Sequence, residues 1–182
     1  MQKSNIEIEF KTAISKEKYL ELLELFELVD NVFKQTNFYF DTNNLDLNND
    51  HTVLRIRQND DRYKVTLKRQ SEERAFENHV FLTKEQALEM IDKGFNTKDF
   101  FSIDYDVTFK SSLDNYRVST PYLDGKLFLD RSEYHGVVDY EIEYEVNDYN
   151  EGKANFEQLL KEHNVKFTKV KRKSERALKI NR

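Results

Sequence analysis

Residues 138–146 alternate strictly between apolar and acidic side chains. Apolar side chains occupy every second position from Val138 to Val146, and carboxylates occupy the positions between them, namely Asp139, Glu141, Glu143 and Glu145. Successive side chains of a β-strand point to opposite faces, so this spacing predicts a strand with one apolar face and one acidic face. Such a strand must bury one face and accommodate a row of like charges on the other.

The same period of two recurs along much of the chain. It is clear in residues 6–11, 53–57, 63–68 and 104–110, and less regular in residues 74–82. Segments 29–41, 115–119 and 126–134 also have compositions typical of strands. Asp60 and Asp61 separate two of these segments, 53–57 and 63–68, which predicts a hairpin. We therefore expect about eight strands.

Three segments have helical spacing instead. One follows Ser15, a residue type favoured at helix N-caps. Another begins at the capping box formed by Thr83 and Gln86 and should end near Gly94, and a third covers about residues 150–163. Strands outnumber helices and most connections are short, which predicts an antiparallel α+β fold.

Composition narrows the possible classes. The 182 residues predict one domain spanning residues 1–182. The sequence has no cysteine, which excludes disulfides and thiolate metal sites, and its four histidines are scattered. No apolar stretch reaches the roughly 20 residues that span a bilayer, and the polar N-terminus is unlike a signal peptide. We therefore expect a cytoplasmic protein without a membrane partner.

Net charge argues against a nucleic-acid partner. The chain carries 29 Lys and Arg against 34 Asp and Glu, a formal charge of −5. General nucleic-acid binding normally requires a basic footprint, so we expect none here.

The charges are sorted by strand. Segments 53–57 and 63–68 present Arg and Lys on their polar faces, segment 138–146 presents only carboxylates, and segment 6–11 presents Glu, Glu and Lys. Like charges about 7 Å apart repel by about 0.6 kcal/mol in water and about 2.4 kcal/mol at an effective dielectric constant near 20. Ordinary solvated strands tolerate the smaller cost. Strands that line a cavity incur the larger repulsion energy unless an ion of opposite charge binds there.

This sorting predicts a cavity inside a closed sheet of about eight strands, with the apolar faces turned outward and covered by helices. A multiply charged anion would relieve the basic rows, and a hard divalent cation would relieve the acidic row. A polyphosphate with Mg²⁺ or Mn²⁺ satisfies both. The alternative is a set of polar faces that simply meet water.

Several short motifs resemble those of the CYTH-domain proteins, or triphosphate tunnel metalloenzymes, especially the small stand-alone bacterial members. The motifs are the ExExK segment at 7–11, the YFDT segment at 39–42 followed by LRIR at 54–57, VTLK at 65–68, the acidic segments at 129–130 and 139–143, and a C-terminal KxKxxR at 171–176. They occur in the family's order and span almost the whole chain.

The resemblance implies an eight-stranded antiparallel β-barrel, or tunnel, with a polar lumen and helices packed outside. It implies divalent metal, Mg²⁺ or Mn²⁺, at Glu7, Glu9, Asp130, Glu141 and Glu143. It implies phosphate contacts from Lys11, Arg55, Arg57, Lys64, Lys68, Arg74, Arg117, Lys171, Lys173 and Arg176. Glu7, Glu9, Lys11 and Glu143 are the expected catalytic residues.

Some positions match the family less directly. Arg74 and Glu77 resemble a basic and acidic pair of the family's fifth strand. They differ in parity, meaning that they lie an odd number of positions apart and would point to opposite faces of a regular strand, so both can face the cavity only across a bulge. Residues 95–115 match no motif, and Arg117 is assigned by its order along the chain. Glu145 shares the parity of Glu143 but is not included in the site.

The expected activity is metal-dependent hydrolysis of a small-molecule triphosphate, with inorganic triphosphate first because no base-reading loop is evident. Thiamine triphosphate and a nucleotide are the other substrates that the sequence leaves open. The alternatives are an adenylate cyclase of the same family, which would release cyclic AMP and pyrophosphate from ATP, and a non-catalytic polyphosphate-binding module. A homodimer is a further expectation.

Overall fold

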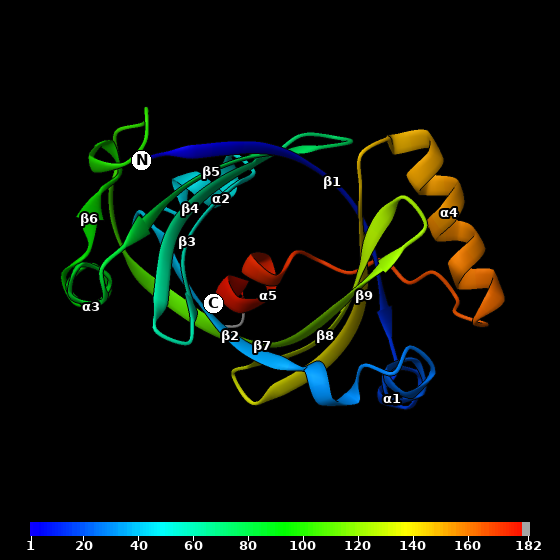
Figure 1. The fold of residues 1–182 in the computed structure, drawn as a ribbon. Helices are drawn as coiled ribbons and strands as arrows, with labels where there is room; N and C mark the ends of the chain where they lie inside the picture. The colour runs from blue at the N-terminus through cyan, green and yellow to red at the C-terminus, as the bar shows by residue number, and fades with distance from the viewer. Residues whose placement is uncertain (180–182) are drawn as a thin grey trace. The chain divides into compact units, whose positions relative to one another are not determined.

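The computed structural model describes residues 1–179 (Figure 1). Its strands are β1 (Lys3–Ile14), β2 (Phe33–Asp41), β3 (Thr52–Asn59), β4 (Arg62–Gln70), β5 (Ala75–Leu82), β6 (Phe95–Asn96), β7 (Asp106–Tyr122), β8 (Gly125–Tyr134) and β9 (Val137–Val146). Its α-helices are α1 (Lys16–Leu25), α2 (Asp46–Asn49), α3 (Lys84–Lys93), α4 (Tyr149–Glu162) and α5 (Lys173–Lys179). No helix in this described range is long and apolar enough to cross a bilayer.

The strands form one hydrogen-bonded series. Their order is β2-β3-β4-β5-β1-β9-β8-β7-β6, and β2 also pairs with β7. The pairing of β2 with β7 joins the two ends of an eight-strand series, and the two-residue β6 is an addition at the edge of β7. This hydrogen-bonded topology confirms the predicted α+β fold with an eight-stranded antiparallel barrel.

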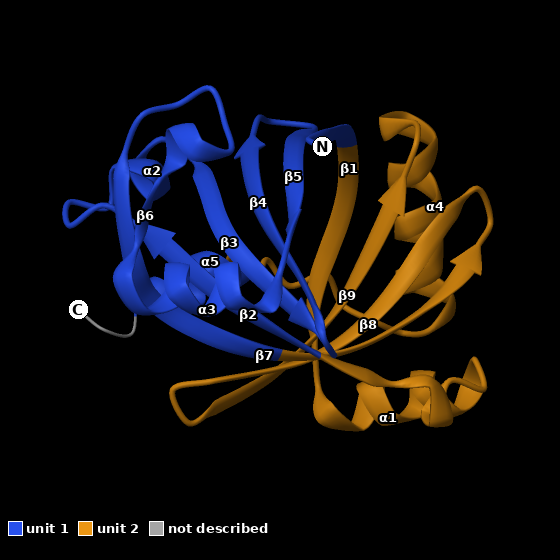
Figure 2. Cartoon of the chain, turned by 60° about the vertical axis from the view of Figure 1, so that its left-hand side comes forward, with its two compact units in different colours: residues 1–6, 35–114, 172–182 blue, residues 7–34, 115–171 orange. Residues whose placement is uncertain are grey.

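The chain divides into two compact units (Figure 2). Unit 1 comprises residues 1–6, 35–114 and 172–182, and unit 2 comprises residues 7–34 and 115–171. Strands β1 and β7 each contribute residues to both units. Each unit has its own apolar cluster and its own set of charged side chains.

In unit 2, helices α1 and α4 supply the apolar partners of β8 and β9. Leu129 and Ile142 from the strands are buried with Leu22 of α1 and Phe156 of α4. Ile142 and Tyr144 have the parity of this cluster, whereas Glu141 and Glu143 have the opposite parity. The acidic side chains of β9 therefore lie on the face that the helices do not cover.

In unit 1, the apolar cluster joins β3 and β4 to the short helices. Leu54, Ile56 and Val65 are buried with Leu47 of α2 and Met90 of α3. The buried residues of α5, by contrast, lie outside this cluster and include Lys173 and Ser174. The basic residues of β3 and β4 alternate with the clustered residues, so they occupy the opposite face of the sheet.

Local sequence signals confirm the helix starts. The Ser15 hydroxyl accepts a hydrogen bond from the Lys18 N–H, and Thr83 and Gln86 form both halves of a capping box. Helix α3 ends at Lys93 and is capped by Gly94, whose φ of 76° is a conformation that glycine adopts readily. One expectation was wrong in detail, because residues 106–110 and 115–119 belong to a single long strand, β7, which begins at Asp106 and not at residue 104.

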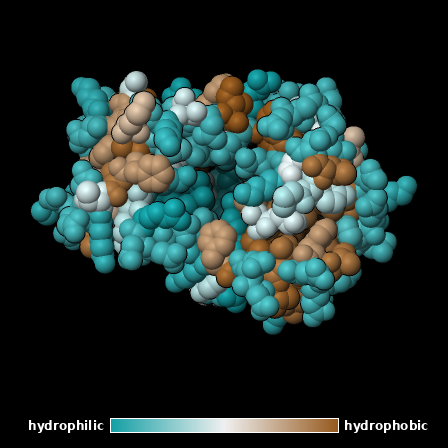
Figure 3. All heavy atoms as spheres, viewed as in Figure 1, coloured by the Kyte–Doolittle hydropathy of each residue, from teal (hydrophilic) through white to brown (hydrophobic). Residues whose placement is uncertain are grey.

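The surface drawn in Figure 3 is mostly hydrophilic, with hydrophobic residues in scattered patches. This agrees with a chain in which 35% of the residues are charged and whose mean hydropathy is −0.83. Exposed apolar residues are common on the surfaces of folded proteins and carry no site by themselves.

Candidate metal and phosphate sites

Three carboxylates meet in unit 2. Asp130 of β8 is the direct cross-strand partner of Glu141 on β9, and Glu143 follows two residues later on the same face. One oxygen from each carboxylate lies within 4.8 Å of the others, and all three residues are buried. Hard divalent cations prefer such all-oxygen ligand sets, so the donor chemistry of this cluster fits Mg²⁺ or Mn²⁺.

Arg117 of β7 contacts the same cluster. Its Nε donates to Asp130 Oδ1 at 2.8 Å, and its Nη2 donates to Asp130 Oδ2 and to Glu143 Oε2, each at 2.6 Å. Burial alone would lower the pKa of the Arg117 guanidinium, but Asp130 and Glu143 outweigh it and raise that pKa well above its ordinary value. Arg117 is therefore a permanent cation within the acidic cluster.

Strand β1 adds charged residues to the same unit. Lys11 lies opposite Glu143 in the antiparallel pairing of β1 with β9, and Glu9 lies opposite Glu145. Glu9 also forms an ion pair of 3.6 Å with Lys11. Glu7 precedes Glu9 with the same parity, so all three residues of the ExExK segment share a strand face. The register also places Glu145, which the sequence interpretation left out, next to Glu9.

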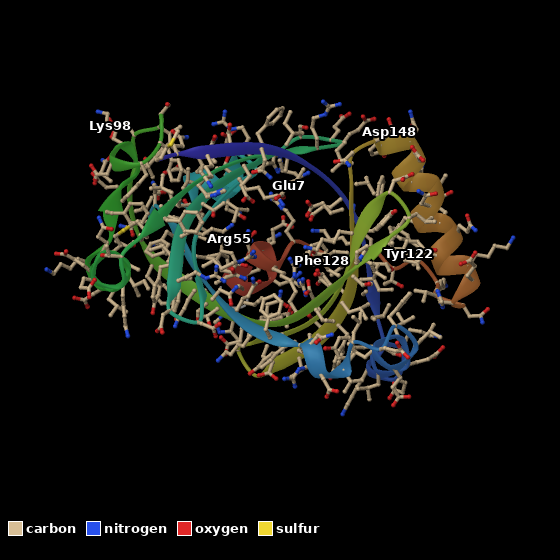
Figure 4. The ribbon with its side chains drawn as sticks, in the orientation of Figure 1. Glu7, Arg55, Lys98, Tyr122, Phe128 and Asp148 are labelled. Atoms are coloured by element: carbon tan, nitrogen blue, oxygen red, sulfur yellow. The ribbon has the colours of Figure 1, made fainter. Side chains whose placement is uncertain are left out.

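A second charged set lies in unit 1. Arg57 of β3 and Lys64 of β4 are cross-strand partners. Arg55, two residues before Arg57 on β3, lies opposite Thr66 of β4. Arg57 is held by a hydrogen bond from its Nε to Asn37 Oδ1 at 2.9 Å. Figure 4 labels Arg55 on β3 and, for contrast, Lys98 at the outer edge of the same unit.

Strand β5 supplies an acidic partner for this basic set. Glu77 lies opposite Lys68 and forms an ion pair of 3.8 Å with Arg55. His79 Nδ1 also lies 3.8 Å from Glu77. Both members of the Arg55–Glu77 pair are largely buried, so their charges are poorly screened by solvent.

Several buried polar atoms on this face have no hydrogen-bond partner among the described residues. They include Asn37 Nδ2, Arg55 Nε and Thr66 Oγ1. Buried polar groups are normally satisfied by protein, water or a ligand. A nearby pocket of about 220 Å³ is lined by Gln35, Arg57, Asn59, Arg62, Tyr63, Lys64 and Phe81. The basic face of unit 1 thus offers donors and space to an oxygen-rich ligand.

The remaining predicted residues lie apart from these groups or on α5. Arg74 is exposed in the turn before β5, which begins at Ala75. Lys171 of unit 2 is exposed ahead of α5. Lys173 and Arg176, three residues apart on α5 in unit 1, share a helix face, and Lys173 is buried.

Sequence reasoning missed neighbours of the charged rows. Phe128, labelled in Figure 4, lies opposite Glu143 and packs its ring 4.3 Å from the Arg117 guanidinium carbon. Asn37 anchors Arg57, and no charge pattern marks it. The only signal for either residue is its parity, which places it on the same strand face as the charged residues.

The geometry agrees with comparisons to known proteins. A model of the CYTH domain matches residues 5–178.

The chain belongs to the CYTH family.

Its relatives include a Bacillus subtilis (strain 168) protein named "Putative triphosphatase YjbK", which is 32% identical over 178 residues and matches over 92% of each chain. The predicted membership in the CYTH family is thereby confirmed.

Solved CYTH-like structures share the fold. The crystal structure of a Bacillus halodurans protein described as "a putative adenylate cyclase" is 27% identical, with a TM-score of 0.86 over 95% of this chain and 97% of that chain. A Hippeastrum protein, described as a "putative adenylyl cyclase" with a dominant triphosphatase activity, is 20% identical, with a TM-score of 0.72 over 96% of this chain and 94% of that chain. At that identity, the second likeness speaks for the fold alone.

Proposed function

We propose that this CYTH protein is a divalent-metal-dependent phosphohydrolase that acts on a triphosphate, with inorganic triphosphate as its substrate. The observation that carries the proposal is the buried meeting of Asp130, Glu141 and Glu143. Three carboxylates this close cost a folded protein free energy unless cations neutralise them. The printed name of the Bacillus subtilis relative, "Putative triphosphatase YjbK", supports the same activity.

Glu7, Glu9, Asp130, Glu141 and Glu143 are the residues proposed to hold Mg²⁺ or Mn²⁺. A divalent cation bound there would neutralise phosphate oxygens and favour deprotonation of water. Glu7 and Glu9 share one face of β1, and the buried three lie on β8 and β9 of the same unit. This set supplies oxygen ligands only, which matches the preference of both metals.

The basic residues are proposed to hold the phosphates. They are Lys11, Arg55, Arg57, Lys64, Lys68, Arg74, Arg117, Lys171, Lys173 and Arg176. Phosphoryl transfer requires little covalent chemistry from the protein, so positioning and charge stabilisation dominate catalysis. Arg57 is anchored by Asn37, and Lys64 lies directly across from it on the neighbouring strand.

Cyclisation of ATP is the second candidate, and one observation favours it. The Bacillus halodurans protein, similar over 95% of this chain, is described as "a putative adenylate cyclase". A cyclase would use the same phosphate contacts, but the ribose 3′-hydroxyl would attack the α-phosphate and release pyrophosphate. The charged residues alone do not separate the two reactions, since both are substitutions at a phosphorus atom of a triphosphate.

Product identification separates them. Purified protein is incubated with inorganic triphosphate or with ATP, in Mg²⁺ or Mn²⁺, and orthophosphate, pyrophosphate and cyclic AMP are followed together. We expect orthophosphate from inorganic triphosphate and no cyclic AMP from ATP. Cyclic AMP with equimolar pyrophosphate would instead establish the cyclase. No turnover of either, together with a triphosphate-induced rise in melting temperature, would indicate a binding module.

A further inference from the structure

The guanidinium of Arg117 already bonds carboxylate oxygens of the acidic cluster, including both oxygens of Asp130. Both oxygens of Asp130 and Oε2 of Glu143 accept its hydrogen bonds at 2.6–2.8 Å. These two residues supply two of the three carboxylates in the acidic cluster. The Asp130 side chain is fully buried, and that of Arg117 is 13% exposed. Water therefore has little access to weaken the contacts.

Phe128 helps to hold Arg117 in this position. Its ring centroid lies 4.3 Å from the Arg117 guanidinium carbon, within the range of a cation–π contact. Because Phe128 is also the cross-strand partner of Glu143, ring and carboxylate contact the guanidinium from neighbouring strands. The position of Arg117 is therefore fixed by packing as well as by charge.

A cation at the cluster and Arg117 cannot both use these oxygens fully. A guanidinium donates along fixed directions, whereas a metal needs the carboxylate oxygens converging on one point. Because Arg117 bonds both oxygens of Asp130, a divalent cation ligated by Asp130 shares an oxygen with the guanidinium, and repulsion between the two cations weakens the Arg117 contacts. Arg117 carries one positive charge and a divalent cation carries two, so the cation attracts these carboxylates more strongly than Arg117 does.

We propose that Arg117 sets the metal affinity of this site as an internal competitor, which a divalent cation displaces and which then turns to the triphosphate. This inference rests on the proposed function, because it takes the acidic cluster as the metal site. Displacement frees a guanidinium with five N–H donors in the unit that also presents Lys11 opposite Glu143. Arg117 thus couples metal binding to phosphate binding.

The test measures the affinity for Mn²⁺ alone, by titration calorimetry or electron paramagnetic resonance, without triphosphate. Arg117→Met keeps an unbranched apolar side chain but removes the competitor, and we expect at least a 10-fold tighter dissociation constant, a free-energy change of about 1.4 kcal/mol. Phe128→Leu keeps every charge and loosens Arg117, so it should tighten Mn²⁺ binding by a smaller factor. This second variant also tests the idea if Arg117→Met folds poorly.

Arg131→Met is the matched control. Arg131 follows Asp130 on β8 but has opposite parity, stacks on Tyr116 at 4.1 Å and pairs with Glu133 at 3.0 Å. Its removal should leave Mn²⁺ affinity unchanged. Arg117→Met should also raise KM for inorganic triphosphate although it binds metal more tightly, an opposite movement that simple loss of structure does not produce.

The outcomes separate the two claims. If wild type binds Mn²⁺ and Asp130→Asn weakens that binding, but neither Arg117→Met nor Phe128→Leu tightens it, the competitor role is wrong and the metal site stands. If neither wild type nor any of these variants binds Mn²⁺, the metal site and the competitor role both fall.

Discussion

Lys11 and Glu143 are direct cross-strand partners on β1 and β9. Directly opposed residues have their Cβ atoms about 4.5–5.5 Å apart, so a side chain assigned to phosphate stands beside one assigned to metal. The register continues with Glu9 opposite Glu145. One face of unit 2 therefore places the cation Lys11 among carboxylates rather than presenting a purely acidic row.

Replacing Lys11 tests the cationic half of this pair. Lys11→Met should raise KM for inorganic triphosphate about 10- to 100-fold, because a charge-assisted contact contributes about 1.5–3 kcal/mol. Steady-state kinetics measures the change. Lys16→Met, on an exposed position of α1, is the matched control and should leave KM unaltered. Equal KM values for wild type and Lys11→Met would remove Lys11 from the phosphate contacts.

Replacing Glu9 tests the first strand as a source of metal ligands. Glu9→Ala should lower the metal-dependent rate at least 100-fold, equivalent to about 2.7 kcal/mol of transition-state stabilisation. The rate is measured across a Mn²⁺ titration, because a lost ligand also shifts the half-saturating metal concentration. Glu24→Ala, on an exposed position of α1, should behave as wild type. Full turnover by Glu9→Ala would show that β1 holds no essential metal ligand.

Replacing Arg57 tests the basic face of unit 1. Arg57→Ala removes the guanidinium anchored by Asn37 and should weaken triphosphate binding about 10- to 100-fold. Both KM and the dissociation constant, measured by calorimetry with Ca²⁺ in place of the active metal, should rise. Arg69→Ala, at an exposed position of β4, serves as control. The phosphate role is contradicted if both constants stay at their wild-type values.

The core of unit 2 should be sensitive to truncation. Leu129 is fully buried between α1, α4 and the strands, so Leu129→Ala should cost about 2–5 kcal/mol of unfolding free energy. For a chain of this size that corresponds to a melting temperature lower by about 5–15 °C. Leu123→Ala, in the exposed turn between β7 and β8, should change it little. A small shift for Leu129→Ala would mean that the site is less tightly packed than the cluster indicates.

The start of α5 should show a pH-dependent stability. Glu175 Oε2 accepts a hydrogen bond from the Arg172 backbone N–H at 3.2 Å and lies 3.6 Å from Arg172 Nε. Burial alone would raise the pKa of Glu175, but Arg172 outweighs it and lowers that pKa below its ordinary value of 4.5. A lowered folded-state pKa stabilises the fold above the ordinary value, and this stabilisation is lost as the pH falls through the folded-state pKa.

Glu175→Gln should therefore lower the melting temperature by about 1–2 °C near neutral pH. The difference from wild type should shrink to nothing in acid below the folded-state pKa. Scanning calorimetry across this pH range measures it, with Glu157→Gln at an exposed position of α4 as control. A difference that is independent of pH would show that Glu175 acts through shape and not through its charge.

The fold was predictable because the alternation of apolar and polar residues along each strand determines which of its faces is apolar. Ile142 and Glu143 are neighbours in sequence, yet the period of two assigns one to the core and the other to the polar face, as the structure shows. The capping residues Ser15 and Thr83 located helix starts for the same kind of reason, since their side chains act locally.

The contacts of Arg117 were not predictable in the same way. They depend on how β7 lies against β8 and β9, which brings Arg117 to carboxylates 13 and 26 positions along the chain. Its positive charge suggested phosphate, whereas the structure pairs it with Asp130 and Glu143. Arg74 was expected to lie on the fifth strand with Glu77, but β5 begins one residue after it, because alternation of residue types locates the end of a strand less well than its faces.

Other expectations stay predictions. They are the single domain over residues 1–182, the homodimer, the cytoplasmic location, the absence of a nucleic-acid or membrane partner, and the individual roles of the site residues.

Residues 95–115, which matched no family motif, form β6, a short 3₁₀ turn and the first part of β7. Asn96 organises this segment by donating hydrogen bonds to Asp104 and Asp106.

The most direct test of the central claim is orthophosphate release from inorganic triphosphate by the purified protein, with Mn²⁺ or Mg²⁺ and again with excess chelator. We predict steady release with metal, complete loss with chelator, and recovery when metal is restored. Release that persists in chelator would contradict the metal role of Asp130, Glu141 and Glu143. No release with either metal would contradict the assignment as an inorganic triphosphatase.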